Sequence, residues 1–207
     1  MIESSQENDS VPFSNLEGKA IEQKNNFAFQ LTNTHPSLCS EIKADAVANG
    51  GTFSVQRTAK LLFLHSGFQL LVIFRIQKRL RSYSGALSIL GDILLKFATD
   101  LTGCYLSSKA TLEGGIHLPH ATGIVIGEGA IVRTGVTIYQ NVTLGRRTAE
   151  DADYPELCQG CTVYAGAQIL GKIVIGKNAT VGANAVVLKS VPDQAVAVGI
   201  PARIIQK

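Results

Sequence analysis

From Leu106 onward, large aliphatic residues recur every six positions, and this period constrains the fold more than any other feature of the sequence. The recurring positions are Leu106, Leu112, Leu118, Ile124, Ile126, Val132, Ile138, Leu144, Leu157, Val163, Ile169, Ile175, Val181 and Val187. The series slips by two residues after Ile124 and is interrupted after Leu144. A period of six in aliphatic residues is typical of parallel β-helices.

The spacing has a direct physical meaning. Each six-residue unit is a short strand followed by a turn, and three units close one triangular coil. Small or branched residues stand four positions after many anchors, for example Ala110, Ala130 and Cys161. Both kinds of residue point into a narrow prism, where successive coils stack apolar layers. We therefore predict a mainly β chain, with a left-handed parallel β-helix over residues 104–207.

The preceding residues, 36–103, have a helical pattern and are predicted to form a small α-helical domain. Ser37 can cap a helix that begins near Leu38 and stops at 49–51. A second helix is expected over 55–81, with a break near Gly67, and a third over 86–101. The third helix places an apolar face on one side, formed by Ile89, Ile93, Leu94 and Phe97. Residues 1–35 are polar and lack an apolar period, so we predict a disordered or loosely docked arm.

Composition narrows the class of protein. The net charge of +3 comes without a dense block of Lys and Arg, so nucleic acid is not an expected partner. The N-terminus lacks a signal-peptide pattern, which favours the cytoplasm. The apolar stretch 61–74 is shorter than the roughly 20 residues that a spanning helix needs. The basic run 75–81 that follows can be read as a contact with an anionic membrane or as a solvated helix end, and we favour the helix end.

Four cysteines are scattered along the chain, and Cys158 and Cys161 form a C-x-x-C pair. No second pair completes a four-ligand zinc site, and the six-residue repeat accounts for both positions, so we expect no metal or redox role. His117 and His120 could share a metal, but a third ligand is not apparent, so we expect no metal site at these histidines.

Four segments give the chain a resemblance to a known family. They are His120-Ala-Thr-Gly-Ile-Val-Ile-Gly-Glu128, the run 136–145, Ala165-Gly-Ala-Gln-Ile-Leu-Gly171 and Val198-Gly-Ile-Pro-Ala-Arg203. They resemble the hexapeptide acyltransferases and, among these, the serine acetyltransferases. The resemblance is dense over 104–205 and loose over 37–103.

The resemblance implies an acetyl-CoA-dependent O-acetyltransferase that forms homotrimers, or pairs of trimers, with active sites between neighbouring prisms. The histidine of the H-A-T-G segment is the general base in that family, which here is His120. Attack of a hydroxyl on a thioester needs such a base, and a neutral imidazole suits the task near pH 7. A backbone N–H near Gly145 is expected to stabilise the oxyanion.

Binding of CoA is also implied by the resemblance. Ala165, Gly166 and Ala183 are expected to meet the pantetheine arm, because small residues let a thin chain approach closely. Lys189 and Arg203 are candidates for contact with the CoA phosphates, since both lie near the end of the prism.

The acceptor side departs from the family pattern. Pro119 and Tyr105 stand where aspartates are expected, and Asp153 and Tyr154 stand where Arg and His are expected. Arg146 or Arg147, together with Asp151 or Asp153, could bind the charged groups of serine differently. The family resemblance implies L-serine as acceptor, as in cysteine biosynthesis, whereas the altered pocket residues favour the alternative, a sugar hydroxyl in polysaccharide biosynthesis.

A third hypothesis is a non-catalytic trimeric scaffold, because the expected orienting aspartate is missing. Glu113, or Asp153 of a neighbouring subunit, could replace that aspartate. The sequence also stops just after Pro201-Ala202-Arg203, so we expect no complex with cysteine synthase.

Overall fold

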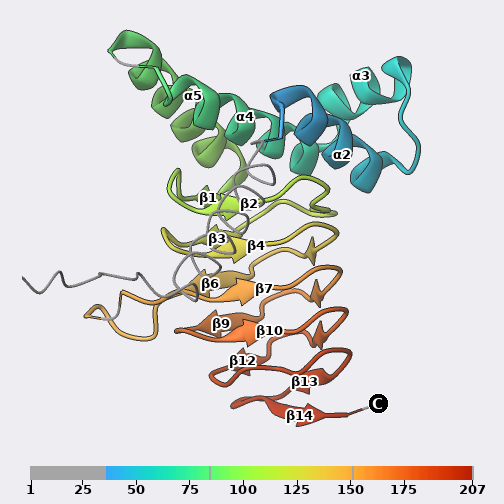
Figure 1. Cartoon of the computed structure of the whole chain (residues 1–207), viewed down its shortest axis with the longest axis vertical. Helices are drawn as coiled ribbons and strands as arrows, with labels where there is room; N and C mark the ends of the chain where they lie inside the picture. Colours follow the sequence, from blue (N-terminus) through green and yellow to red (C-terminus); the bar gives the residue numbers. More distant parts are fainter. Residues whose placement is uncertain (1–35, 84, 151, 207) are drawn as a thin grey trace, which may run out of the picture. The chain divides into compact units, whose positions relative to one another are not determined.

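The computed structural model describes residues 36–83, 85–150 and 152–206. The predicted arm, residues 1–35, lies outside the described residues. Residues 37–207 cluster into one unit, which contains four helices and a stack of short strands (Figure 1).

The helices are α2 (Leu38–Gly50), α3 (Val55–Leu64), α4 (Ser66–Leu80) and α5 (Ala86–Thr102). Ser37 caps α2 by accepting a hydrogen bond from the N–H of Ser40, and Gly51 ends the helix with a φ of 81°, which favours glycine. The predicted second helix is divided at His65, two residues before the expected break. His65 caps α4, because its side chain accepts a hydrogen bond from the N–H of Phe68.

The predicted face of α5 is not the face that the protein buries. Ile89, Ile93 and Phe97 are 58–62% exposed, whereas Gly91, Leu95 and Ala98 are buried. Gly91 brings α5 close to α4, since an added Cβ there would lie 3.1 Å from the Cβ of Leu80. The sequence identifies an apolar face of α5, but close packing against α4 buries another face, on which Gly91 and Ala98 let the two helices approach.

The remaining chain is a prism of short parallel strands. The strands are β1 (Tyr105–Leu106), β2 (Thr111–Leu112), β3 (Val125–Ile126), β4 (Ile131–Val132), β5 (Thr137–Ile138), β6 (Thr143–Gly145), β7 (Glu156–Leu157), β8 (Thr162–Val163), β9 (Gln168–Leu170), β10 (Val174–Ile175), β11 (Thr180–Val181), β12 (Val186–Val187), β13 (Val196–Val198) and β14 (Arg203–Ile205). They form three sheets, in the orders β1-β3-β6-β9-β12, β10-β7-β4-β2 and β14-β13-β11-β8-β5. Only the β13–β14 pair among the described strands is antiparallel.

The interior of the prism confirms the six-residue reading. All fourteen anchors are buried, as are the small residues that follow them, including Ala110, Ala130 and Cys161. Register is fixed because equivalent anchors stack, for example Leu144 on Ile126 and on Ile169. A slip of one residue would expose the anchors and bury their polar neighbours.

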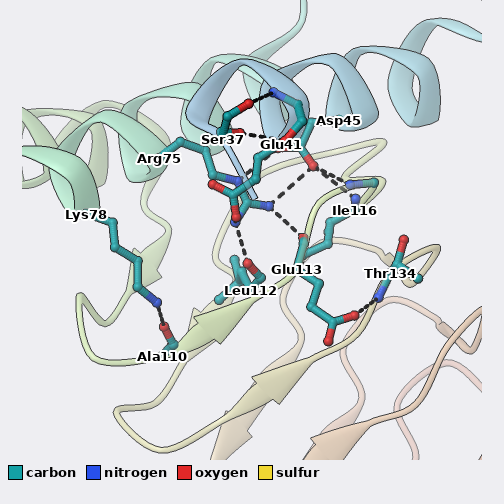
Figure 2. Close-up of polar contacts among 12 residues, drawn as sticks. Ser37, Glu41, Asp45, Arg75, Lys78, Ala110, Leu112, Glu113, Ile116 and Thr134 are labelled. Atoms are coloured by element: carbon teal, nitrogen blue, oxygen red, sulfur yellow. Dashed lines mark hydrogen bonds and ion pairs between the residues drawn. The ribbon is translucent and has the colours of Figure 1, made fainter. Parts of the chain in front are cut away.

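A buried ion pair joins the helices to the first coil (Figure 2). The Nε of Arg75 on α4 lies 3.1 Å from a carboxylate oxygen of Asp45 on α2, and both side chains are at most 1% exposed. Arg75 also donates to the carbonyl oxygens of Leu112 and Glu113. Asp45 accepts from the N–H groups of Gly115, at 2.8 Å, and Ile116, at 3.1 Å. Both charges are thus satisfied at the open end of the prism.

We predict that Asp45→Ala destabilises the protein by about 3–5 kcal/mol, because it removes the buried carboxylate that pairs with Arg75 and leaves the guanidinium with Glu41, at 3.4 Å, as its ion-pair partner. Urea unfolding followed by circular dichroism measures the loss. Asp100→Ala is the matched control, since it removes the exposed Lys96–Asp100 pair and should cost less than about 1 kcal/mol. Equal losses in the two variants would contradict the role given to the buried pair.

Candidate active site

His120 lies where the repeat slips by two residues. The turns that join the third sheet to the first form one corner of the prism, which we call the histidine corner; it comprises residues 119–124, 139–142, 164–167 and 182–185. The uppermost turn is two residues longer than the others and carries His120, whose side chain is exposed. The slip in the sequence therefore marks a widened turn that presents an imidazole.

The helical region supports this turn from behind. Asn49 on α2 accepts a hydrogen bond from the N–H of Leu118 and donates to the carbonyl oxygen of Ile116. Gly67 on α4 lies against the carbonyl of Leu118, and an added Cβ would overlap it. The backbone leading to His120 is thus held by two helices, which is the kind of rigid support that a catalytic side chain needs.

Two further histidines lie near enough to His120 to interact with its charge. Burial lowers the pKa of His65, and the positive charge of a protonated His120 lowers it further. Burial likewise lowers the pKa of His117, with added contributions from His65 and His120. The cap that His65 makes with the N–H of Phe68 uses Nδ1 as an acceptor, which fits a neutral ring.

Aromatic rings continue the corner below His120. The ring of Tyr139 is 6.3 Å from that of His120, and Tyr164 stacks on Tyr139 at 5.1 Å with an interplanar angle of 16°. Neither tyrosine is among the site residues predicted from the sequence. Each directly follows an anchor, Ile138 or Val163, so the repeat register alone would have placed them on one corner.

The predicted CoA contacts Ala165, Gly166 and Ala183 also lie on the histidine corner. Part of their backbone is already used, because Gly166 donates to the carbonyl of Gln140 and Asn184 donates to that of Ala165. The side-chain Oε1 of Gln140 is buried and has no hydrogen-bond partner among the described residues. The sequence pattern does not single out this buried acceptor.

The predicted acceptor residues lie on a different corner of the same chain. The turns that join the first sheet to the second form what we call the loop corner, residues 107–110, 127–130, 146–155, 171–173 and 188–190. Arg146 and Arg147 begin its long loop, directly after Gly145 at the end of β6. Asp151 lies outside the described residues. Within one chain, the structure does not bring these residues together with His120.

Two residues of this loop are held by contacts inside the chain. The ring of Tyr154 packs over the 127–129 turn, and a Cβ on Gly129 would lie 2.6 Å from it. The carboxylate of Asp153 pairs with Lys172 at 3.3 Å, and the guanidinium of Arg146 lies 5.8 Å from the centre of the Tyr154 ring. Tyr154 therefore serves to fix the loop on the prism.

The other predicted residues lie apart from one another. Lys189 is exposed on the loop corner, after β12, and Arg203 is exposed at the start of β14 in the third sheet. Both belong to the last coils, as predicted, but on different sides. Glu113, proposed as a substitute orienting acid, instead accepts from Arg133 and from the N–H of Thr134. No carboxylate in the described part of the chain hydrogen-bonds to the ring of His120.

The cysteine pair has the structural role that the repeat suggested. Cys158 and Cys161 are both free thiols, and Cys161 is an inward-facing residue of the prism. Burial raises the pKa of Cys161 to about 12, which suppresses the reactive thiolate. Across residues 36–206, leaving out 84 and 151, no group of three or more His, Cys, Asp or Glu side chains is placed to hold a metal ion.

Comparison with known proteins places this geometry in a family. Residues 154–189 match the family described as bacterial transferase hexapeptide (six repeats). A serine acetyltransferase in complex with CoA is 34% identical, with a TM-score of 0.71, and the match covers 83% of this chain and 71% of that one. The chain belongs to the serine acetyltransferase family of hexapeptide-repeat transferases. The match also fits the left-handed sense predicted for the coil.

Other members of the family are similar over most of this chain. Soybean serine acetyltransferase complexed with serine is 32% identical, with a TM-score of 0.72, over 85% of this chain and 72% of that one. The serine acetyltransferases of Synechococcus elongatus and Haemophilus influenzae are 40% and 37% identical, over 72% and 84% of this chain. The chain spans 60% and 65% of the length of those two relatives.

We predict that the melting temperature falls as the pH drops below about 6.5. The pKa values of His65 and His117 are lowered in the folded state, so the unfolded chain binds protons first, and acid favours unfolding. The contribution of these two histidines to the free energy of unfolding is fully present above about pH 6.5 and is lost as the pH falls toward their folded-state pKa values. Thermal melts of the wild type and of His117→Gln between pH 5 and pH 8 test this, since a slope that the substitution leaves unchanged would exclude His117 as a source.

Proposed function

We propose that the protein is an acetyl-CoA-dependent O-acetyltransferase that transfers an acetyl group to the hydroxyl of L-serine. The observation that carries the proposal is the histidine corner. It places an exposed imidazole at the head of a row of small residues, in a chain similar over 83% of its length to a serine acetyltransferase in complex with CoA. The acceptor follows from soybean serine acetyltransferase, complexed with serine.

His120 acts as the general base. Its neutral imidazole takes the proton from the acceptor hydroxyl as the oxygen attacks the thioester carbonyl carbon of acetyl-CoA. The C–S bond then breaks, and the imidazolium returns the proton to the departing sulfur. The products are an O-acetyl ester and CoA, and the histidine ends in its starting state. A backbone N–H near Gly145 is proposed to bind the oxyanion during the reaction.

The histidine corner suits the pantetheine arm of CoA. Ala165, Gly166 and Ala183 leave room for a thin chain. Lys189 and Arg203, exposed on the last coils, are the candidates for the phosphates.

The active site is completed by a second subunit in a homotrimer. His120 lies on one corner of the prism, whereas Gly145, Arg146 and Arg147 lie on another, so one chain alone presents two halves of a site. In a ring of three prisms, the loop corner of one chain faces the histidine corner of the next. The exposed apolar residues of α5, among them Ile93 and Phe97, offer a surface through which two trimers would pair.

A sugar hydroxyl is the second candidate acceptor. Asp153 is paired with Lys172, and Tyr154 is packed over the 127–129 turn, so neither is free to bind the charged ends of an amino acid. The stacked rings of Tyr139 and Tyr164 would instead suit a sugar ring. We propose the cytoplasm as the compartment, because acetyl-CoA is available there.

We predict that His120→Ala lowers the rate of acetyl transfer at least about 10²-fold, since a general base is removed. CoA release is followed with a thiol reagent, using L-serine and a panel of sugars and nucleotide sugars as acceptors. Lys177→Gln, a change at an exposed residue on another corner, is the control and should keep full activity. Release of CoA by the wild type with serine supports serine as the acceptor, and release with sugars alone supports a sugar. Unchanged turnover in His120→Ala would exclude His120 as the general base.

We predict that mixed trimers rescue activity. His120→Ala chains and Arg146→Ala/Arg147→Ala chains are each inactive alone, but random co-assembly of equal amounts should restore about one quarter of the wild-type rate, because each site draws on two chains. The two proteins are unfolded together, refolded and assayed by CoA release. Separately refolded samples, mixed afterwards without exchange, provide the control. Complete inactivity of the co-refolded mixture would place the whole site in one chain.

A further inference from the structure

The positive charge of the protein is concentrated in one stretch of the helical region. Residues 46–91 contain six Lys and Arg and no Asp or Glu, whereas the rest of the chain contains thirteen basic and sixteen acidic residues. Arg75 is buried with Asp45, but the other five cations are exposed: Arg57, Lys60, Lys78, Arg79 and Arg81. Arg57 and Lys60 lie on α3, whereas Lys78, Arg79 and Arg81 lie at the C-terminal end of α4, where Arg81 pairs with Asp92.

Helix α3 combines this charge with exposed apolar side chains. None of its residues is buried, and Val55, Phe63 and Leu64 are 73–79% exposed. Val55 and Phe63 are eight positions apart and so share one face of the helix, next to Lys60. Phe53, just before the helix, is a further exposed aromatic residue. An exposed helix with an apolar face and cations beside it is the pattern of an interfacial membrane helix.

The neighbouring helix α4 does not expose an apolar face to solvent. Its apolar residues Phe68, Leu71 and Phe74 are fully buried within the protein. No single helix among the described residues is long and apolar enough to cross a membrane, although α3 and α4 together pass that test as a pair bent by 99°. Because the α4 half is committed to the core and the ten residues of α3 span only about 15 Å, α3 can lie on a bilayer rather than cross it.

We propose that α3, with Phe53 before it, docks on an anionic lipid bilayer. Val55, Leu62 and Phe63 enter the boundary between headgroups and acyl chains, and Arg57 and Lys60 bind lipid phosphates. The positive charge of α3 favours an anionic lipid surface over a second copy of the chain as its partner. Two α3 faces packed together would bring four cations into contact without a single acid from residues 46–91, whereas an anionic surface complements them.

Sedimentation with vesicles tests the proposal. The full-length protein is mixed with vesicles of phosphatidylcholine alone, and with vesicles in which part of this lipid is replaced by phosphatidylglycerol. We expect binding to the anionic vesicles, release at high salt and little binding to the neutral ones. Arg57→Gln/Lys60→Gln should weaken binding about thirtyfold and Phe63→Ser about tenfold. Circular dichroism and thermal melts in solution establish that the variants are folded.

The matched control is Lys172→Gln/Lys177→Gln, which removes the same charge from exposed positions on the prism and should leave binding unchanged. Equal weakening in the control would show that net charge alone drives binding, and would overturn the docking site. Failure of the wild type to bind anionic vesicles would also overturn it. If Phe63→Ser instead reduces the mass measured by light scattering, the α3 face pairs with another copy of the chain and not with lipid. None of these outcomes depends on whether the acetyltransferase activity is found.

Discussion

The buried pair between Asp45 and Arg75 is the interaction on which the rest of the structure depends. A β-helix is open at both ends, and its first coil exposes N–H and C=O groups that stacking satisfies in later coils. Arg75 donates to the carbonyls of Leu112 and Glu113, while Asp45 accepts from the N–H groups of the next turn. Each partner cancels the charge of the other, so neither is buried alone. The pair thus closes the upper end of the prism and fixes the helices to it.

This junction also explains why the imidazole of His120 can be exposed and still be held in place. The turn that carries it is two residues longer than the equivalent turns below, which would ordinarily make it looser. Asn49 and Gly67, from the two helices that Asp45 and Arg75 tie down, contact the backbone at Leu118 and Ile116. Stability of the junction and geometry of the proposed base are therefore linked through one segment of backbone.

The two corners of the prism have different physical characters. The histidine corner combines small turn residues with stacked tyrosines, which suits a thin ligand. The loop corner carries Arg146 and Arg147 on a long loop that Tyr154 fixes to the prism. In the proposed homotrimer, the histidine corner of one chain and the loop corner of the next would together form one site.

The sequence by itself determined the prism, because the six-residue period forces anchors such as Leu144 and Ile169 into stacked layers whatever surrounds them. It also determined the ends of α2, since Ser37 and Gly51 act locally, and it singled out His120. Only the tertiary structure decided which face of α5 is buried and that Arg75 of α4 hydrogen-bonds to the first coil. It also decided that Arg146 and His120 lie on different corners. These features depend on contacts between residues far apart in the chain, and a local pattern carries no information about which surfaces meet.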